Sequence, residues 1–173
     1  MSASTCQGQI GTGAAVTWAN AETGITFNLA DSQTAVTPVA IPNTTGTNFS
    51  WIKNLVIAVT VVGTTSISNR TVKMSASAVT GLALYWKAVA VASYAQASSG
   101  NRPASSGSNG AVPSGYTLMT TTASQYDNTT VSTASTGPNG SMVVCVLSID
   151  NTYTGGAGSA TSLPTIILSY DEA

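Results

Sequence analysis

Residues 51–62 read WIKNLVIAVTVV, and this stretch decides the fold class. From Leu55 onward nearly every position is apolar, and β-branched residues predominate. A short apolar run of this kind, bounded by turn residues, is typical of a strand that is covered on both faces. The run is far shorter than the roughly 20 apolar residues that span a bilayer. It therefore predicts a core strand of a sheet and no membrane partner.

The two segments that follow this strand alternate between apolar and polar positions. Residues 67–77, ISNRTVKMSAS, place Arg70 on the face of the apolar side chains and Lys73 on the opposite face. Residues 82–95, LALYWKAVAVASYA, alternate in the same way and place Lys87 on the face opposite to the Leu and Trp side chains. Two further strands are therefore expected, each with one face toward a core.

Similar patterns elsewhere, and the near absence of helix signals, predict an all-β chain of about eight strands. A length of 173 residues is enough for one domain with a real core. We expect a single-domain β-sandwich or a jelly-roll-like barrel with long Gly- and Ser-rich loops, formed by residues 21–173. Residues 1–20 are poor in core pattern and are expected to be an extended N-terminal arm. Residues 97–115, ASSGNRPASSGSNGAVPSG, are expected to be a surface loop whose tip projects.

The residue types that catalysis needs are scarce. The chain has no histidine, which removes the commonest general base and metal ligand. A carboxylate pair such as Asp127 and Asp150 would suit a glycosidase, but Asp beside turn residues ordinarily caps the turn. Cys145 lies in an apolar run, and a disulfide with Cys6 is an alternative to two free thiols. We predict no enzyme activity, no catalytic residue, no metal site and no cofactor.

The charge pattern bounds the partners. Only 6% of residues are charged and the formal net charge is -1, so little electrostatic repulsion opposes self-association. Five cations along the whole chain are too few to form a phosphate-binding surface, so nucleic acid is not an expected partner. Residues 1–13, MSASTCQGQIGTG, lack the basic and apolar regions of a secretory signal, which predicts synthesis in the cytoplasm.

The run FSWIKNLVIAVTVVG (49–63) followed by SNRTVKMSASAVTGLALYWKAVA (68–90) resembles head decoration (cement) proteins and other small structural proteins of tailed bacteriophages. The resemblance implies an all-β subunit of the virion that is made in the host cytoplasm. It also implies oligomerisation, as a homotrimer, and binding to the major capsid protein, which stabilises the capsid. It transfers no site residues. A phage tail or fibre component and a carbohydrate-binding or adhesin β-sandwich domain remain as alternatives.

Candidate interface residues fall into two sets. In the expected arm, Ile10, Val16 and Trp18 are the side chains that would anchor on a neighbouring subunit, whereas the Trp residues would stack on sugars in the adhesin alternative. In the two alternating strands the candidates are the cations Arg70, Lys73 and Lys87. An Arg on an apolar face buries its stem and offers a planar fork to a carboxylate, which suits a subunit contact.

Overall fold

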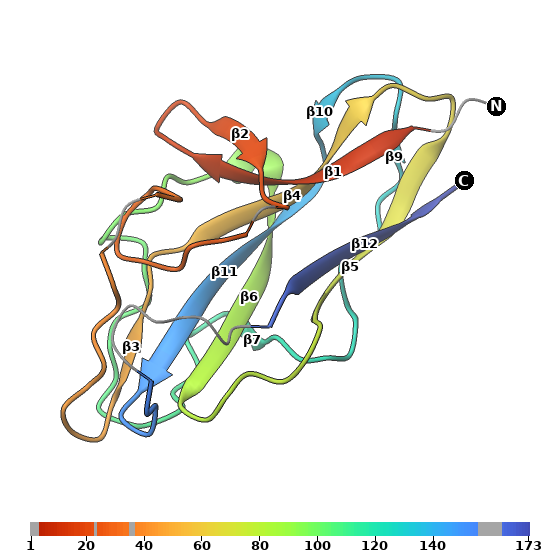
Figure 1. Cartoon of the computed structure of the whole chain (residues 1–173). Helices are drawn as coiled ribbons and strands as arrows, with labels where there is room; N and C mark the ends of the chain where they lie inside the picture. Colours follow the sequence, from red (N-terminus) through yellow and green to blue (C-terminus); the bar gives the residue numbers. More distant parts are fainter. Residues whose placement is uncertain (1–3, 23, 35–36, 156–163) are drawn as a thin grey trace.

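The computed structural model describes residues 4–22, 24–34, 37–155 and 164–173. These residues form antiparallel strands with one 3-10 turn, η1 (Val91–Ser93), which confirms the all-β prediction. The strands lie in two sheets that pack face to face and do not close into a barrel within the described residues (Figure 1). No helix in this part of the chain is long and apolar enough to cross a membrane.

The larger sheet forms the centre of the molecule. Its main path runs β2-β1-β4-β11-β6-β7, with β10 added beside β4 and β3 beside β11. The strands are β1 (Thr5–Thr12), β2 (Thr17–Asn20), β3 (Thr47–Phe49), β4 (Lys53–Val61), β6 (Leu82–Ala90), β7 (Thr117–Leu118), β10 (Gly137–Pro138) and β11 (Ser141–Asp150).

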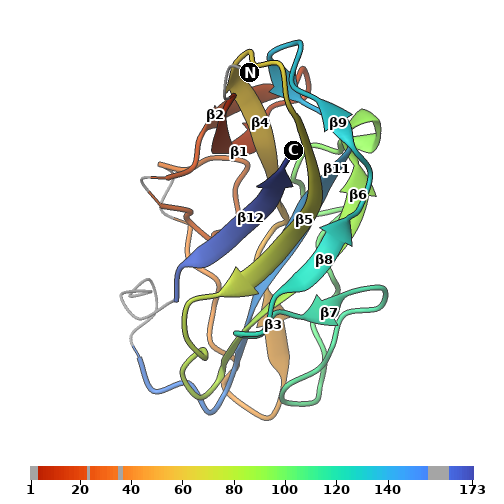
Figure 2. The same ribbon diagram turned by 90° about the vertical axis from the view of Figure 1, so that its right-hand side faces the viewer.

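The smaller sheet covers one face of the larger one (Figure 2). Its order is β12-β5-β8, with β9 added beside β5. The strands are β5 (Ser66–Met74), β8 (Ser124–Asp127), β9 (Val131–Ser132) and β12 (Ile166–Glu172). Eight of the described strands have four or more residues, namely β1, β2, β4, β5, β6, β8, β11 and β12, in agreement with the predicted β-sandwich.

The strand that decided the fold class is covered on both faces, as its sequence predicts. In β4 the side chain of Leu55 packs in the core between the two sheets, together with Val143 of β11. The side chain of the next residue, Val56, belongs to a second core on the outer face of the larger sheet, together with Val144. The alternation of β5 is confirmed too, because its polar face is more exposed than the face that carries Arg70. In β6, Leu84 and Trp86 pack in the core between the sheets, and Tyr85 on the opposite face is buried in the second core.

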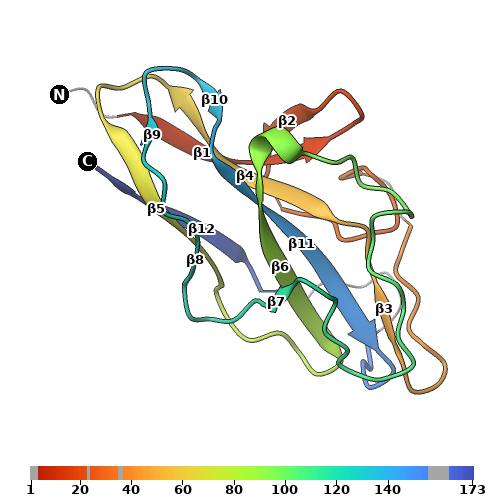
Figure 3. The same cartoon turned by 180° about the vertical axis from the view of Figure 1, so that it is seen from behind.

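The outer face of the larger sheet is covered by the segment that follows β6 (Figure 3). Ala97 is only 3% exposed, and the backbone of Ser106 exchanges two hydrogen bonds with Thr47, at 2.8 and 2.9 Å. The Asn109 side chain accepts a hydrogen bond from the backbone nitrogen of Gly46 at 2.8 Å. The predicted loop over 97–115 therefore exists, but it lies along the sheet instead of projecting from it.

The predicted N-terminal arm is corrected for the residues that the structure describes. Strand β1 pairs with β4 along its length and turns back into β2, so this segment belongs to the larger sheet. Ile10 is 1% exposed in the core between the sheets. Trp18 lies close over Gly11, where an added Cβ would come within 2.9 Å of the indole ring. The segment joins the sheet through backbone pairing and through contacts at glycine. Neither kind of contact requires alternating apolar residues, so the sequence does not show the strand.

Strand β8 carries a one-residue bulge that sets up the charged pair of the core. Asp127 pairs with Arg70 of β5, but the next pair is Gln125 with Thr71, so Tyr126 is the extra residue. Tyr126 and Asp127 are both buried, although neighbouring side chains of a regular strand point to opposite faces. The bulge thus turns the Asp127 carboxylate inward, toward Arg70.

Candidate functional site

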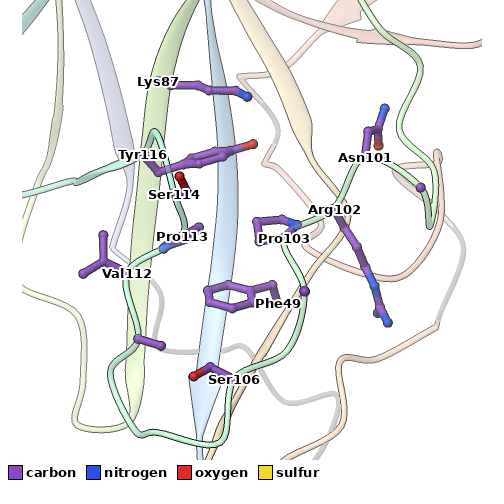
Figure 4. Close-up of a pocket in the computed structure, with 13 residues that line it drawn as sticks. Phe49, Lys87, Asn101, Arg102, Pro103, Ser106, Val112, Pro113, Ser114 and Tyr116 are labelled. Carbon is purple, nitrogen blue, oxygen red and sulfur yellow. The ribbon is translucent and has the colours of Figure 1, made fainter.

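A cavity of about 450 Å³ lies between the outer face of the larger sheet and the segment that follows β6. The sheet side of its wall is formed by Phe49 of β3 and Lys87 of β6, and Tyr116 stands beside Lys87 just before β7. The opposite wall carries Asn101, Arg102 and Pro103, whereas Val112, Pro113 and Ser114 lie on the side of Tyr116 and Ser106 lies at the lower end (Figure 4). Its size falls within the usual range of small-molecule sites.

Lys87 and Tyr116 form the polar wall of the cavity. The Lys87 ammonium nitrogen lies 4.7 Å from the centre of the Tyr116 ring, a cation–π contact that fixes both side chains. Their polar ends extend in the same direction, toward the segment that carries Asn101 and Pro103 (Figure 4). Burial raises the pKa of Tyr116 to about 12, so its hydroxyl stays protonated and can donate a hydrogen bond at neutral pH.

The loop wall is held in place by its own hydrogen bonds. The Asn101 side chain accepts a hydrogen bond from the backbone nitrogen of Ser98 at 2.9 Å and donates one to the carbonyl of Gln96 at 2.5 Å. Asn101 therefore ties together the turn that positions Arg102 and Pro103. Ser106 is anchored to β3 by the backbone pairing described above. The loop that forms part of the cavity wall is therefore held by hydrogen bonds to its own residues and to β3.

The cavity gathers positive charge on a chain that has little of it. All five cations lie in the described part of the chain. Lys53 and Arg70 are 2% and 0% exposed, so Lys73, Lys87 and Arg102 are the cations that reach solvent. Two of these three line the cavity, and none of the six acidic residues does, although the structure describes all of them. An anionic group is therefore the ligand type that this cavity would attract.

The predicted interface residues do not form one surface. Ile10 and Arg70 are buried inside the chain. Trp18 is half-buried and makes an edge-to-face contact with Tyr94, with ring centres 5.8 Å apart. Val16 is 39% exposed in the turn between β1 and β2. The three candidates of the N-terminal segment are therefore separated: Ile10 lies in the core, Trp18 is half-buried and Val16 is at the surface.

The three cations of the alternating strands are also separated. Lys73 lies on β5 of the smaller sheet and Lys87 lies on β6 of the larger one. The Arg70 guanidinium donates to the Asp127 carboxylate at 2.6 Å, to the Asn139 carbonyl at 2.6 Å and to the Thr129 hydroxyl at 3.2 Å. Arg70 therefore meets a carboxylate of its own chain, and its fork is not available to a neighbouring subunit.

The two acidic residues that were candidates for a carboxylate pair serve turns, as the sequence predicts. The Asp150 carboxylate accepts hydrogen bonds from the backbone nitrogen and the hydroxyl of Thr152, at 2.9 and 2.6 Å. The Asp127 carboxylate does the same for Thr129, at 2.8 and 2.6 Å. No group of three or more Cys, Asp or Glu residues with the geometry of a metal site occurs among the described residues.

Three residues of the cavity were not singled out from the sequence. Phe49 and Tyr116 appear in it as ordinary strand aromatics, and Arg102 appears as one cation in a loop. The Trp residues, which the adhesin alternative requires for sugar stacking, do not line the cavity. The sequence signal for this site is the run of Pro, Gly and Ser residues before Tyr116. It indicates a loop, but it does not show which face of the sheet the loop covers.

The comparisons with known proteins add no family to this description. No protein-family model matches the chain, and neither a curated protein nor a solved structure gives a significant match.

Proposed function

We propose that the chain is a structural subunit of a virus particle, of the type that decorates a capsid as an oligomer bound to the major capsid protein. The observation that carries this proposal is the edge of the smaller sheet. In the described part of the chain, β12 lies at the end of its sheet and pairs on one side, with β5. This strand has seven residues and pairs with β5 in regular register from Ile166 to Ser169, before a register shift at its end. Its regular part can accept a strand from another subunit.

The chemistry of β12 supports assembly through this edge. Its first three residues, Ile166, Ile167 and Leu168, carry no charge or proline that would discourage pairing. The two acidic residues at its end are engaged within the chain, since Asp171 accepts from the Asn69 side chain at 2.8 Å and Glu172 accepts from Ser4 and Thr65. The first part of the edge, over Ile166–Leu168, therefore lacks the charges that usually protect such strands, and the two charges lie at its end.

The rest of the surface suits a subunit of an assembly as well. Val61 and Val62, at the end of β4, are 54% and 46% exposed. Exposed apolar side chains on a surface with so few charges meet little repulsion when two copies approach. A tail or fibre subunit would share these properties, and binding to the capsid separates that alternative from a decoration protein.

The proposal is tested by mass and by binding. We expect light scattering to give the mass of a trimer, and the protein to bind capsids from which it has been removed. Ser169→Lys places a charge on the exposed edge strand and should shift the chain to the monomer. Thr121→Lys places the same charge at an exposed site outside the strands and should leave the mass unchanged. A monomer at high concentration that does not bind stripped capsids would overturn the proposal.

A further inference from the structure

We propose that the cavity between β6 and the segment 100–116 binds a small carboxylated sugar, with Lys87 and Tyr116 holding the carboxylate. This inference goes beyond the proposed role in assembly and does not rest on it. A particle subunit with such a site would contact acidic glycans as well as its neighbours.

The charge distribution selects an anion. Lys87 extends toward the opposite wall, whereas the Arg102 side chain, which belongs to that wall, extends away from Lys87 and Tyr116 (Figure 4). The lining contains no carboxylate that would neutralise Lys87. The other solvent-facing cation, Lys73, is on the smaller sheet, so the positive charge that faces this cavity is that of Lys87. Charged hydrogen bonds to an ammonium are among the stronger polar contacts that a protein makes.

The arrangement of Lys87 and Tyr116 selects a carboxylate. Their ammonium and hydroxyl groups extend side by side into the cavity (Figure 4), so the two oxygens of one carboxylate can accept from both donors. The Tyr116 hydroxyl is a phenol and is protonated at neutral pH, and burial raises its pKa further, so it remains a donor. A single ammonium with a phenol offers fewer charged donors than the clusters of cations that bind phosphate groups.

The remaining walls select a sugar ring. Pro103 and Ala104 present apolar surface that is not buried, against which the C–H groups of a pyranose can pack, whereas Phe49 and Pro113 are buried. The hydroxyls of Ser106 and Ser114 lie in the same lining, where they can exchange hydrogen bonds with sugar hydroxyls. An apolar acid would leave these polar groups without partners, and a neutral sugar would leave Lys87 without a counter-charge.

The test is a titration of the full chain followed by NMR, with glucuronate and N-acetylneuraminate as the acidic probes. Glucose and N-acetylglucosamine serve as neutral comparators, and inorganic phosphate serves as the competing anion. We expect the acidic sugars to bind with a Kd in the millimolar range, more tightly than the neutral sugars and phosphate. Binding should weaken as salt concentration rises.

Matched variants locate the site. Lys87→Gln should weaken binding of the acidic sugars about tenfold, the loss expected for one charged hydrogen bond. Tyr116→Phe should weaken it less, because the ring remains and a neutral donor is lost. Lys73→Gln removes an equal charge from the other sheet and should leave the Kd unchanged.

Three results would overturn the proposal: no binding of either acidic sugar, equal binding of the neutral sugars, or equal losses in Lys87→Gln and Lys73→Gln. Preferential binding of phosphate would do the same, because it would indicate a general anion site. The Ser169→Lys variant, which is expected to be monomeric, should keep the sugar affinity of the native chain. Failure of the sugar site and failure of the assembly role are therefore distinguishable.

Discussion

Arg70 and Asp127 face each other across β5 and β8, with the guanidinium Nη2 2.6 Å from the carboxylate Oδ2 and both side chains buried, at 0% and 3% exposure. The same carboxylate oxygen accepts from the backbone nitrogen of Ser141, at the start of β11. The guanidinium also donates to the carbonyl of Asn139, in the turn before that strand. The pair thus joins the smaller sheet to the larger one.

Removing the charge of Asp127 should therefore destabilise the whole domain. Asp127→Asn leaves the Arg70 guanidinium buried without a counter-charge, and breaking one partner of a buried pair typically costs about 3–5 kcal/mol. We expect a loss of about 3 kcal/mol in the free energy of unfolding, because the Asn139 carbonyl still accepts from Arg70. Denaturant unfolding followed by circular dichroism measures it.

The matched control is Asp171→Asn, which removes an exposed carboxylate from β12. Its hydrogen bond from Asn69 lies at the surface, where such contacts contribute little. We expect a change below about 1 kcal/mol. Equal losses in the two variants would show that the buried pair does not join the sheets as described.

The same carboxylate makes the domain sensitive to acid. Burial alone would raise the pKa of Asp127, but the hydrogen bonds from Thr129 and Ser141 and the charge of Arg70 outweigh it and lower the pKa to about 2. The pKa is lower in the folded than in the unfolded chain, so this stabilisation is complete above the unfolded value of 3.8 and is lost as the pH falls toward 2. We expect the unfolding free energy to drop by about 2 kcal/mol in that window and the drop to disappear in Asp127→Asn.

Strand patterns carried the fold prediction, and side-chain partners were harder to foresee. The apolar run over 55–62 and the alternation in β5 and β6 depend on residues near in sequence, so their placement in the sandwich could be predicted. The Arg70 contact depends on the bulge at Tyr126, which shifts the register of a distant strand by one residue. Such a shift leaves no trace in an alternation pattern.

Two predictions failed because backbone contacts replaced side-chain signals. Strand β1 is rich in Gly, Gln and Thr, yet it pairs along β4 because its hydrogen bonds come from the main chain. The segment around Ser106 and Asn109 lacks apolar residues, yet it bonds to the backbone of residues 46 and 47. The cavity at Lys87 depends on that placement, so its position could not be foreseen.

A glycine is required at position 81 because the turn that contains Tyr153 passes close to it. It adopts a φ of +81°, and a Cβ there would overlap the backbone nitrogen of Tyr153. Gly81→Ala therefore adds a left-handed penalty of about 1–2 kcal/mol to a collision with main-chain atoms that cannot rotate away. We expect a total loss of at least about 2 kcal/mol in unfolding free energy, measured by denaturant titration.

Gly8→Ala is the control for this prediction. Gly8 lies in β1 without a positive φ, and nothing lies within 4 Å of an added Cβ. The substitution reduces the conformational freedom of the unfolded chain, so we expect stability to stay equal or to rise slightly. A loss as large as that of Gly81→Ala would mean that the close approach is not the cause.

The two thiols should differ in reactivity. Cys145 is fully buried, and burial raises its pKa to about 12, so it carries almost no thiolate at neutral pH. Cys6 is half-buried, and its pKa is also raised by burial. We expect a thiol reagent to modify Cys6 slowly in the native protein and Cys145 only after unfolding. Both thiols should react when the protein is unfolded in denaturant without a reductant. If fewer than two react, the free state of both cysteines in the structure is contradicted.

Lys53 should give the domain an unusual response to alkali. Its ammonium is buried at the start of β4, where it donates to the Asn28 side chain at 2.9 Å and to the carbonyl of Ala30 at 2.8 Å. Loss of hydration lowers its pKa to about 8 from 10.5, and the charge of Asp31 offsets only part of this effect. The folded chain therefore releases the Lys53 proton at a lower pH than the unfolded chain does.

Because the unfolded chain binds more protons between pH 8 and 10.5, this residue makes stability rise with pH in that window. Lys53→Met removes the titrating ammonium and keeps every thiol and phenol. The contributions of those groups to the pH dependence of stability therefore cancel when the two proteins are compared. We expect the unfolding free energy of the native chain, relative to Lys53→Met, to increase by about 1 kcal/mol from pH 8 to pH 9. A constant difference across this range would show that the ammonium keeps its charge, because the Asn28 and Ala30 oxygens then replace its hydration in full.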